Sequence, residues 1–304
     1  MTTSTSSATL KTWVLALQEP LPRRTHTGMT SPNGRQLRLF SNGVLIVIGV
    51  CFALPMLWLL VAAFDPTASL TLKWPDRFTL SNFEKVLTPT LTFIPLLNSL
   101  MLSGGCAIVT VVVAVLAAYP LSRYRMRVNK PFLYGILFGT GLPITAMMVP
   151  VYSLFVVFNL IDSLPGIILF MAATSLPMAI WMMKNFMDSV PIVLEEAAWI
   201  DGASMMSTLT RVVVPLMRPG IAVVFIFIFV QSWGNFFVPF VLLLTPDLQP
   251  AAVSIFAFFG QYGAVAYGQL AAFSIVYSVP VLALYIFTSR VLGGGSALAG
   301  AVKG

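Results

Sequence analysis

The residues that could do chemistry in this chain gather in one stretch, EEAAWIDGASMMSTLTRVVVPLMRPG, at residues 195–220. It holds two glutamates, an aspartate and two arginines, in a chain of which only 9% is charged. An enzyme at a membrane face needs paired carboxylates, a histidine cluster or a nucleophile beside a base. Beyond the acids of this stretch the sequence offers no such set. We therefore expect no catalytic residue, no metal site and no cofactor.

The polar stretch predicts two short helices joined by a turn. Ser189 favours a helix start, and residues 190–201 can then form about three turns. Gly202 is a natural stop because glycine tolerates a positive φ. A second helix fits residues 204–214, and Pro215 closes it before the next apolar run. Its expected apolar face, at helical spacing, consists of Met205, Met206, Leu209, Val212 and Val213.

Small side chains cluster beside the predicted turn, at Ala197, Ala198 and Ala203. Small residues let another surface approach the backbone closely. Two interpretations stay open from the residues alone. The stretch is either a solvated loop with two short helices or a docking surface for a partner protein.

The rest of the chain has the composition of a polytopic membrane protein. Of its 304 residues, 58% are hydrophobic, whereas soluble domains carry about 25% charged residues. A membrane-spanning helix needs ~20 mostly apolar residues. Six runs satisfy that length, and they predict an all-α fold with six transmembrane helices. The runs are residues 43–64, 98–121, 132–156, 164–183, 220–244 and 269–292.

The distribution of basic residues predicts the orientation. If the N-terminus is cytoplasmic, only Lys73, Arg77 and Lys85 of the 17 Lys and Arg residues fall in outer segments. Positive residues favour the cytoplasmic side. Both termini are therefore expected in the cytoplasm. The polar stretch, which lies between the fourth and fifth helices, is expected there as well. The net charge of +7 then requires no nucleic-acid partner.

The segments outside the apolar runs predict a simple domain plan. Residues 1–39 form a polar cytoplasmic tail and residues 40–304 a transmembrane domain. Because MTSPNGRQLRLF makes a compact basic lead from Met29, we expect residues 1–28 to be an upstream extension. The outer loop 245–268 carries AAVSIFAFFG, which is too short to span and predicts an interfacial or re-entrant helix.

The polar stretch resembles the EAA loop of permease subunits from bacterial ABC importers. Glu-Ala-Ala at 196–198, Asp-Gly-Ala at 201–203 and Val-Pro at 214–215 match that loop in type and spacing. NSLMLSGGCAIVTVVVAVLAAYPLSRYRMR, WGNFFVPFVLL and the terminal GAVKG resemble the maltose-type carbohydrate branch, in its second permease. The resemblance covers about residues 40–304. Gly234 and Asn235 depart from the Asn and acidic residue that this branch usually carries there.

The resemblance implies a coupling mechanism. The loop would dock on a separate ATPase subunit and transmit its motion to the membrane helices. The chain has no G-x-x-x-x-G-K-[ST] phosphate cradle of its own. Implied partners are a second homologous permease, two ATPase subunits, an extracytoplasmic solute-binding protein and a sugar, in a bacterial cytoplasmic (inner) membrane. The implied coupling residues are Glu195, Glu196, Ala197, Ala198, Asp201, Gly202, Ala203 and Pro215.

The fifth run offers polar and aromatic side chains for a translocation path, at Gln231, Trp233 and Asn235. Gln231 and Asn235 share a helical face. Hydrogen bonds between helices, worth ~0.6 kcal/mol on average, explain them equally well. Trp233 could stack on a sugar ring or simply pack.

Other functions remain as alternatives. The same architecture could import glycerol phosphate or a polyol. A secondary carrier is disfavoured because no predicted span holds a carboxylate, and ionisable groups inside a membrane are usually functional. A membrane enzyme is disfavoured by the missing catalytic set.

Overall fold

The structure is a computed structural model that describes residues 32–71, 73–141, 143–259 and 265–293. The predicted extension 1–28 and the GAVKG ending lie outside the described residues. The chain divides into two units, residues 1–56 and 57–304. Within the described residues every regular element is helical, apart from one isolated antiparallel bridge between Phe259 and Val265. The predicted all-α class is confirmed.

The first unit consists of most of one helix, α2 (Pro32–Ala63), which has Pro55 inside it. Its side chains from residue 39 to residue 56 are exposed, although nearly all of them are apolar. Long exposed apolar helices match the hydrocarbon of a bilayer, which demands ~20 apolar residues. Residues 32–39, expected in the polar tail, are helical.

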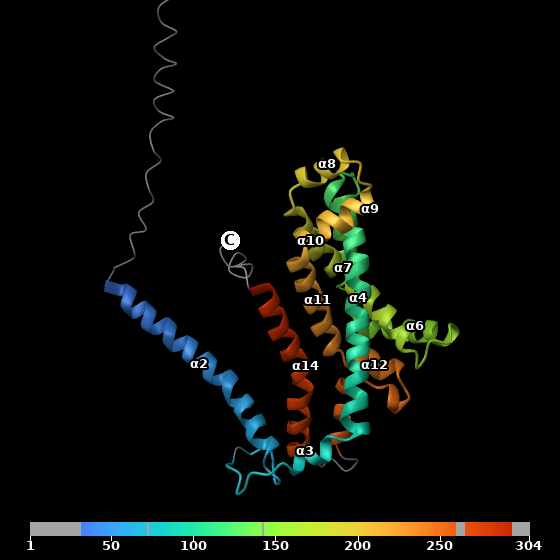
Figure 1. Ribbon diagram of the computed structural model, residues 1–304. Coiled ribbons are helices and arrows are strands. Elements are labelled where there is room, and N and C mark those ends of the chain that lie inside the picture. Colours follow the sequence, from blue (N-terminus) through green and yellow to red (C-terminus); the bar gives the residue numbers. More distant parts are fainter. Residues whose placement is uncertain (1–31, 72, 142, 260–264, 294–304) are drawn as a thin grey trace, which may run out of the picture. The chain divides into compact units, whose positions relative to one another are not determined.

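The centre of the second unit is formed by three helices, α4 (Ile94–Arg123), α7 (Leu164–Asp188) and α11 (Arg218–Trp233). In Figure 1, α11 runs beside part of the longer helix α4, and the two helices are in contact. Fully buried alanines, Ala107, Ala114, Ala118 and Ala179, occupy the shared core. Small residues permit close helix approach in membranes, where packing rather than the hydrophobic effect holds helices together.

A second core cluster forms where α14 (Tyr267–Gly293) meets the short helix α3 (Ser81–Val86). The buried Asn82 side chain donates hydrogen bonds to the carbonyls of Ala63 at 3.1 Å and Asp65 at 2.9 Å. The expected short helix in AAVSIFAFFG is present as α13 (Ala251–Ser254), followed by a 3-10 turn over Ile255–Phe258. These pieces close one end of the unit.

Within the described residues, four helices are long and apolar enough to cross a membrane, or up to six if each of two bent pairs forms one span. The expected single helix over residues 132–156 is wrong. The structure has α5 (Asn129–Gly139) and α6 (Ile144–Val157), bent by 90°. Pro143 has an extended backbone, with ψ of 123°, and α6 starts after it. Proline lacks an N–H, so a helix cannot continue through it without losing a hydrogen bond.

The expected helix over residues 220–244 is also interrupted. α11 ends at Trp233, residues 234–236 are not helical, and α12 (Phe237–Leu242) follows. Asn235 Oδ1 accepts a hydrogen bond at 3.1 Å from the N–H of Val238, in the first turn of the new helix. Asparagine side chains compete with the helix for backbone N–H groups, so a break here is locally stabilised.

Candidate functional site

The polar stretch forms the expected pair of helices. α8 (Val193–Ile200) ends at a glycine turn, and α9 (Met205–Thr208) follows. Gly202 has φ of +84°, which confirms it as the stop. The Ala203 N–H donates to the Ala198 carbonyl at 2.9 Å and the Gly202 N–H to the Trp199 carbonyl at 3.0 Å. This paired closure satisfies carbonyls that the helix end leaves open.

The second helix differs from its prediction. After α9 the chain makes a wide π-helical turn over Leu209–Val213 and continues into α10 (Val214–Leu216). The wide turn rotates the face, so Met205 and Met206 are exposed while Leu209 and Val213 are buried. Pro215 lies in the first turn of α10, where its missing N–H costs nothing, and does not end the helix.

Glu195 lies beneath the loop surface. Its side chain is fully buried and accepts hydrogen bonds from Arg123 Nε at 2.6 Å and from the Tyr119 hydroxyl at 2.9 Å. Arg123 also donates to the Val190 carbonyl at 3.1 Å. Both partners of Glu195 sit in the last turns of α4. The ion pair therefore fastens α8 to the central helix of the unit.

The other predicted coupling residues lie at or near the surface of the loop. Glu196, Ala197, Asp201 and Gly202 are exposed, and Ala198 and Ala203 are partly buried. Large apolar side chains stand among them, with Val193 69% and Ile200 86% exposed. In Figure 1, α8 and α9 lie together at one end of the second unit. Glu195 is thus the one buried glutamate of the loop, whereas the loop's exposed surface combines polar and apolar side chains.

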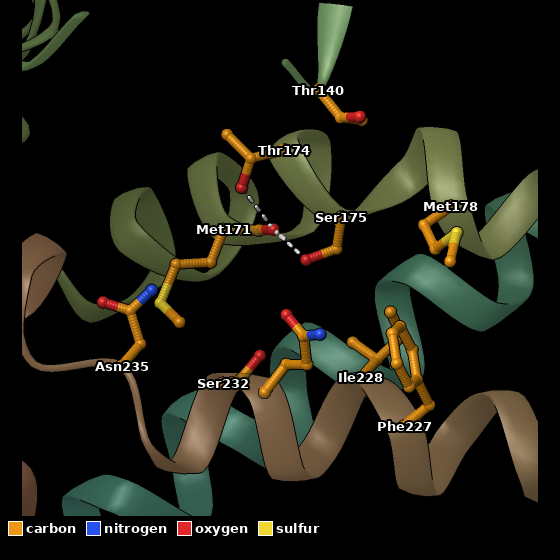
Figure 2. A pocket seen from close by; sticks show the side chains of 10 residues that line it. Thr140, Met171, Thr174, Ser175, Met178, Phe227, Ile228, Ser232 and Asn235 are labelled. Atoms are coloured by element: carbon orange, nitrogen blue, oxygen red, sulfur yellow. Dashed lines mark hydrogen bonds between the residues drawn. The ribbon is translucent and has the colours of Figure 1, made fainter. Parts of the chain in front are cut away.

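A cavity of about 320 Å³ lies between α7 and α11. It brings together Gln231 and Asn235, which the sequence placed on one face. Figure 2 shows Thr174 and Ser175 of one helix opposite Ser232 and Asn235. The Thr-Ser pair inside an otherwise apolar run was the signal for this wall, and the sequence analysis missed it. The lining residues are Thr140, Met171, Thr174, Ser175, Met178, Phe227, Ile228, Gln231, Ser232 and Asn235.

Trp233 does not line this cavity. Its ring is buried and stacks between Phe229, at a centroid distance of 5.5 Å, and Tyr277, at 5.4 Å. The Tyr277 hydroxyl donates to the Trp233 carbonyl at 2.6 Å. The ring therefore packs α11 against α14, and a role in the translocation path stays a prediction.

A second hollow of about 490 Å³ lies between α11 and α14. Its wall is mainly apolar, with Val223, Ile226, Phe227 and Val230 on one side. Gln231 lines this groove as well as the polar cavity.

Asp162 joins two connections between helices, the one before α7 and the one after α12. Its carboxylate accepts hydrogen bonds from the backbone N–H groups of Thr245 at 3.0 Å and Leu244 at 2.6 Å, and from the Thr245 hydroxyl at 3.0 Å. These bonds, the backbone bond from Thr245 foremost, hold the pKa of the Asp162 carboxyl below its ordinary value of 3.8. The loop before α7 is thereby tied to the end of α12.

Residues 110–293 match the family described as "Binding-protein-dependent transport system inner membrane component". The chain is 31% identical over 277 residues to the sulfoquinovosyl glycerol transport system permease protein SmoH of Agrobacterium fabrum. That match covers 90% of this chain and 95% of the relative. It is 30% identical over 267 residues to the diacetylchitobiose uptake system permease protein NgcG of Streptomyces coelicolor, covering 86% and 88%.

The fold also matches a chain in the crystal structure of a bacterial ABC transporter involved in the import of the acidic polysaccharide alginate. The TM-score is 0.75 at 21% sequence identity, over 87% of this chain and 99% of that chain. At this identity the likeness shows a shared fold.

Proposed function

Since the chain belongs to the family of binding-protein-dependent transport system inner membrane components, we propose that it forms half of the translocation path of an ATP-driven sugar importer. As a member of that family it is a multi-pass permease subunit of the inner membrane, and it is not itself an enzyme. The proposed remainder of the assembly is a second homologous permease, two ATPase subunits and a solute-binding protein outside.

The observation that carries this proposal is the two-sided construction of α8. On the face of the helix that packs on the protein, Glu195 is bound to Arg123 of α4. The opposite face is exposed. Val193 and Ile200 expose apolar surface there beside Glu196 and Asp201. Exposed apolar groups rimmed by polar ones mark protein interaction sites. Movement of an ATPase bound to this face would therefore be transmitted directly to α4 through the ion pair.

The proposed orientation follows from the loop. If α8 and α9 dock an ATPase, they lie in the cytoplasm, and the basic residues of the neighbouring segment 123–130 lie there with them. The same orientation places the Asp162 connection on the outer side. The six-span topology is part of this proposal, with each bent pair counting as one span.

Sugar as the cargo is supported by the relatives. Two of them, at 30% identity or more, are named for carbohydrate uptake, one for sulfoquinovosyl glycerol and one for diacetylchitobiose. The cavity between α7 and α11 fits such a cargo, because hydroxyl and amide groups line it beside methionine and phenylalanine.

Affinity purification of the tagged chain from its own membranes tests the assembly. We expect an ATPase and a second permease to co-purify, and Ile200→Glu to reduce ATPase recovery strongly. Leu80→Glu is the matched control, since Leu80 is 60% exposed on the outer loop. Recovery of the ATPase at the original level with Ile200→Glu, together with full ATP-driven uptake, would refute docking at α8.

A further inference from the structure

The polar cavity between α7 and α11 has a hydrogen-bonding character that its residue types alone do not reveal. Its volume of about 320 Å³ lies within the range of small-molecule sites, ~300–1,000 Å³. None of its lining residues is charged. What it can bind therefore depends on which of its polar groups still have protons to give.

The hydroxyl groups that line the cavity already donate their protons in hydrogen bonds within the protein. Thr174 and Ser175 both donate to the Met171 carbonyl, at 2.9 and 2.8 Å. Figure 2 shows these two bonds converging on one oxygen. Thr140 donates to the Leu137 carbonyl at 2.6 Å. Each hydroxyl keeps only lone pairs for a ligand, so this wall accepts hydrogen bonds and does not donate them.

The amide groups supply what donors remain. Asn235 Oδ1 is occupied by the Val238 N–H at 3.1 Å, which leaves the Asn235 Nδ2 protons free for the cavity. Gln231 is exposed and forms no side-chain hydrogen bond within the described part of the chain. The cavity thus offers several acceptors, two amide donors and no formal charge.

The end of α11 adds an electrostatic preference. The helix terminates at Trp233, directly beside the cavity residues Ser232 and Asn235. A helix C-terminus carries a partial negative charge, equivalent to about half an electron. An anion here would meet that charge and a wall of lone pairs.

We propose that this cavity is a binding site, on this subunit itself, for an uncharged polyhydroxylated solute, and that it rejects anionic analogues of the same size. A sugar hydroxyl can donate to the Thr174 and Ser175 oxygens and accept from the Asn235 amide. This inference rests on the proposed importer function and narrows its cargo. Glycerol phosphate, which bears two negative charges or nearly so, does not fit the site.

The test uses cysteine protection in the purified complex of this chain with its partner subunits. Ser175→Cys is placed in a background of Cys51→Ala and Cys106→Ser, and its modification by a neutral thiol reagent is timed. Serine at 106 keeps an acceptor for the hydroxyl of the lining residue Ser232, which donates to Cys106 Sγ at 3.1 Å. Glucose and trehalose are the uncharged probes, with glucuronate as the matched anion. We expect the uncharged sugars to slow modification and the anionic analogue to leave its rate unchanged.

The matched control is Ser278→Cys on α14. Ser278 donates to the carbonyl four residues earlier at 2.8 Å, as Ser175 does, but it is exposed outside the cavity. No sugar should protect it. Protection at residue 175 by glucuronate equal to that by glucose, or no protection by either uncharged sugar, would overturn the proposed site. Neither result touches ATPase co-purification, so the importer function is judged separately.

A second variant isolates the donor. Asn235→Asp keeps an oxygen for the Val238 N–H but removes the free Nδ2 protons and adds a negative charge. We expect the glucose concentration for half protection to rise about tenfold, as loss of one hydrogen bond to a ligand typically requires. Asn159→Asp, at an exposed turn with φ of 55°, is the control and should leave protection unchanged. Equal protection in both variants would contradict the assignment.

Discussion

Arg123 Nε lies 2.6 Å from Glu195 Oε1, and the two side chains are 6% and 0% exposed. The pair joins residues 72 positions apart, one at the end of α4 and the other in α8. Because Tyr119 and the Val190 carbonyl complete the cluster, the charges are desolvated but hydrogen-bonded. Such a pair is a rigid connection rather than a large source of stability.

Glu195→Gln should lower both stability and coupling. Removing one partner of a buried ion pair leaves the other charge unpaired, which costs about 3 kcal/mol or more. We expect a lower melting temperature of the detergent-purified complex and less uptake per ATP hydrolysed. Glu196→Gln is the control, because Glu196 is exposed and its loss should leave the melting temperature unchanged. Equal melting temperatures for the two variants would contradict the role of the ion pair.

Gly202→Val should uncouple ATP hydrolysis from uptake. The glycine has φ of +84°, a region that costs a residue with a side chain about 1–2 kcal/mol and suits a β-branched residue worst. No atom lies within 4 Å of the added Cβ, so the cost is in the backbone alone. Gly202→Asn, which tolerates positive φ, should retain most transport. Parallel assays of ATPase activity and uptake in proteoliposomes measure the ratio, and full uptake in the valine variant would refute the turn's role.

Gly220→Ala should disturb the packing of α11 on α7. An added Cβ would lie 2.5 Å from Phe186 Cγ and 2.8 Å from its Cβ, and the base of a ring cannot move freely. Overpacking of this kind costs about 1–3 kcal/mol. Gly104→Ala on α4 is the control, since nothing lies within 4 Å of its added Cβ. Thermal unfolding of the two variants should separate them, with only Gly220→Ala destabilised. The packing argument is wrong if both behave alike.

The Asp162 connection should make stability depend on acid pH. The pKa of this carboxyl is held below 3.8 in the folded protein, so its contribution is fully present above that value. It is lost as the pH falls through the lower folded pKa. Asp162→Asn removes the charge while keeping an acceptor, so it should lower the melting temperature at neutral pH and weaken its fall in acid. Identical pH profiles for both proteins would exclude this contribution.

The sequence predicted those features of the fold that depend on local residue pattern and on hydropathy. The helices that became α4 and α7 and the turn at Gly202 follow from apolar length and from glycine's freedom at positive φ. The breaks before Pro143 and at Gly234 were missed, because a hydropathy window averages over the backbone and cannot register a lost hydrogen bond. Both positions carried a signal, a proline and a glycine beside an asparagine.

The cavity and the ion pair could not be predicted from the sequence. Nothing local marks Glu195 as buried and Glu196 as exposed, since the two are neighbours of the same type. Only the arrival of Arg123 from α4 distinguishes them. Likewise Gln231 and Asn235 could be placed on one face from their spacing, but the opposite wall, with Thr174 and Ser175, depends on how α7 packs.

Gln231 borders the polar cavity on one side and the apolar groove between α11 and α14 on the other. Phe227 lines both hollows as well, so these two side chains together separate a site suited to hydroxyl groups from a site suited to hydrocarbon. The molecule that fills the groove in the membrane therefore contacts the far side of the wall of the polar cavity. Solute selectivity then depends on that neighbouring molecule as well, and replacing it would change the selectivity without a substitution in this chain.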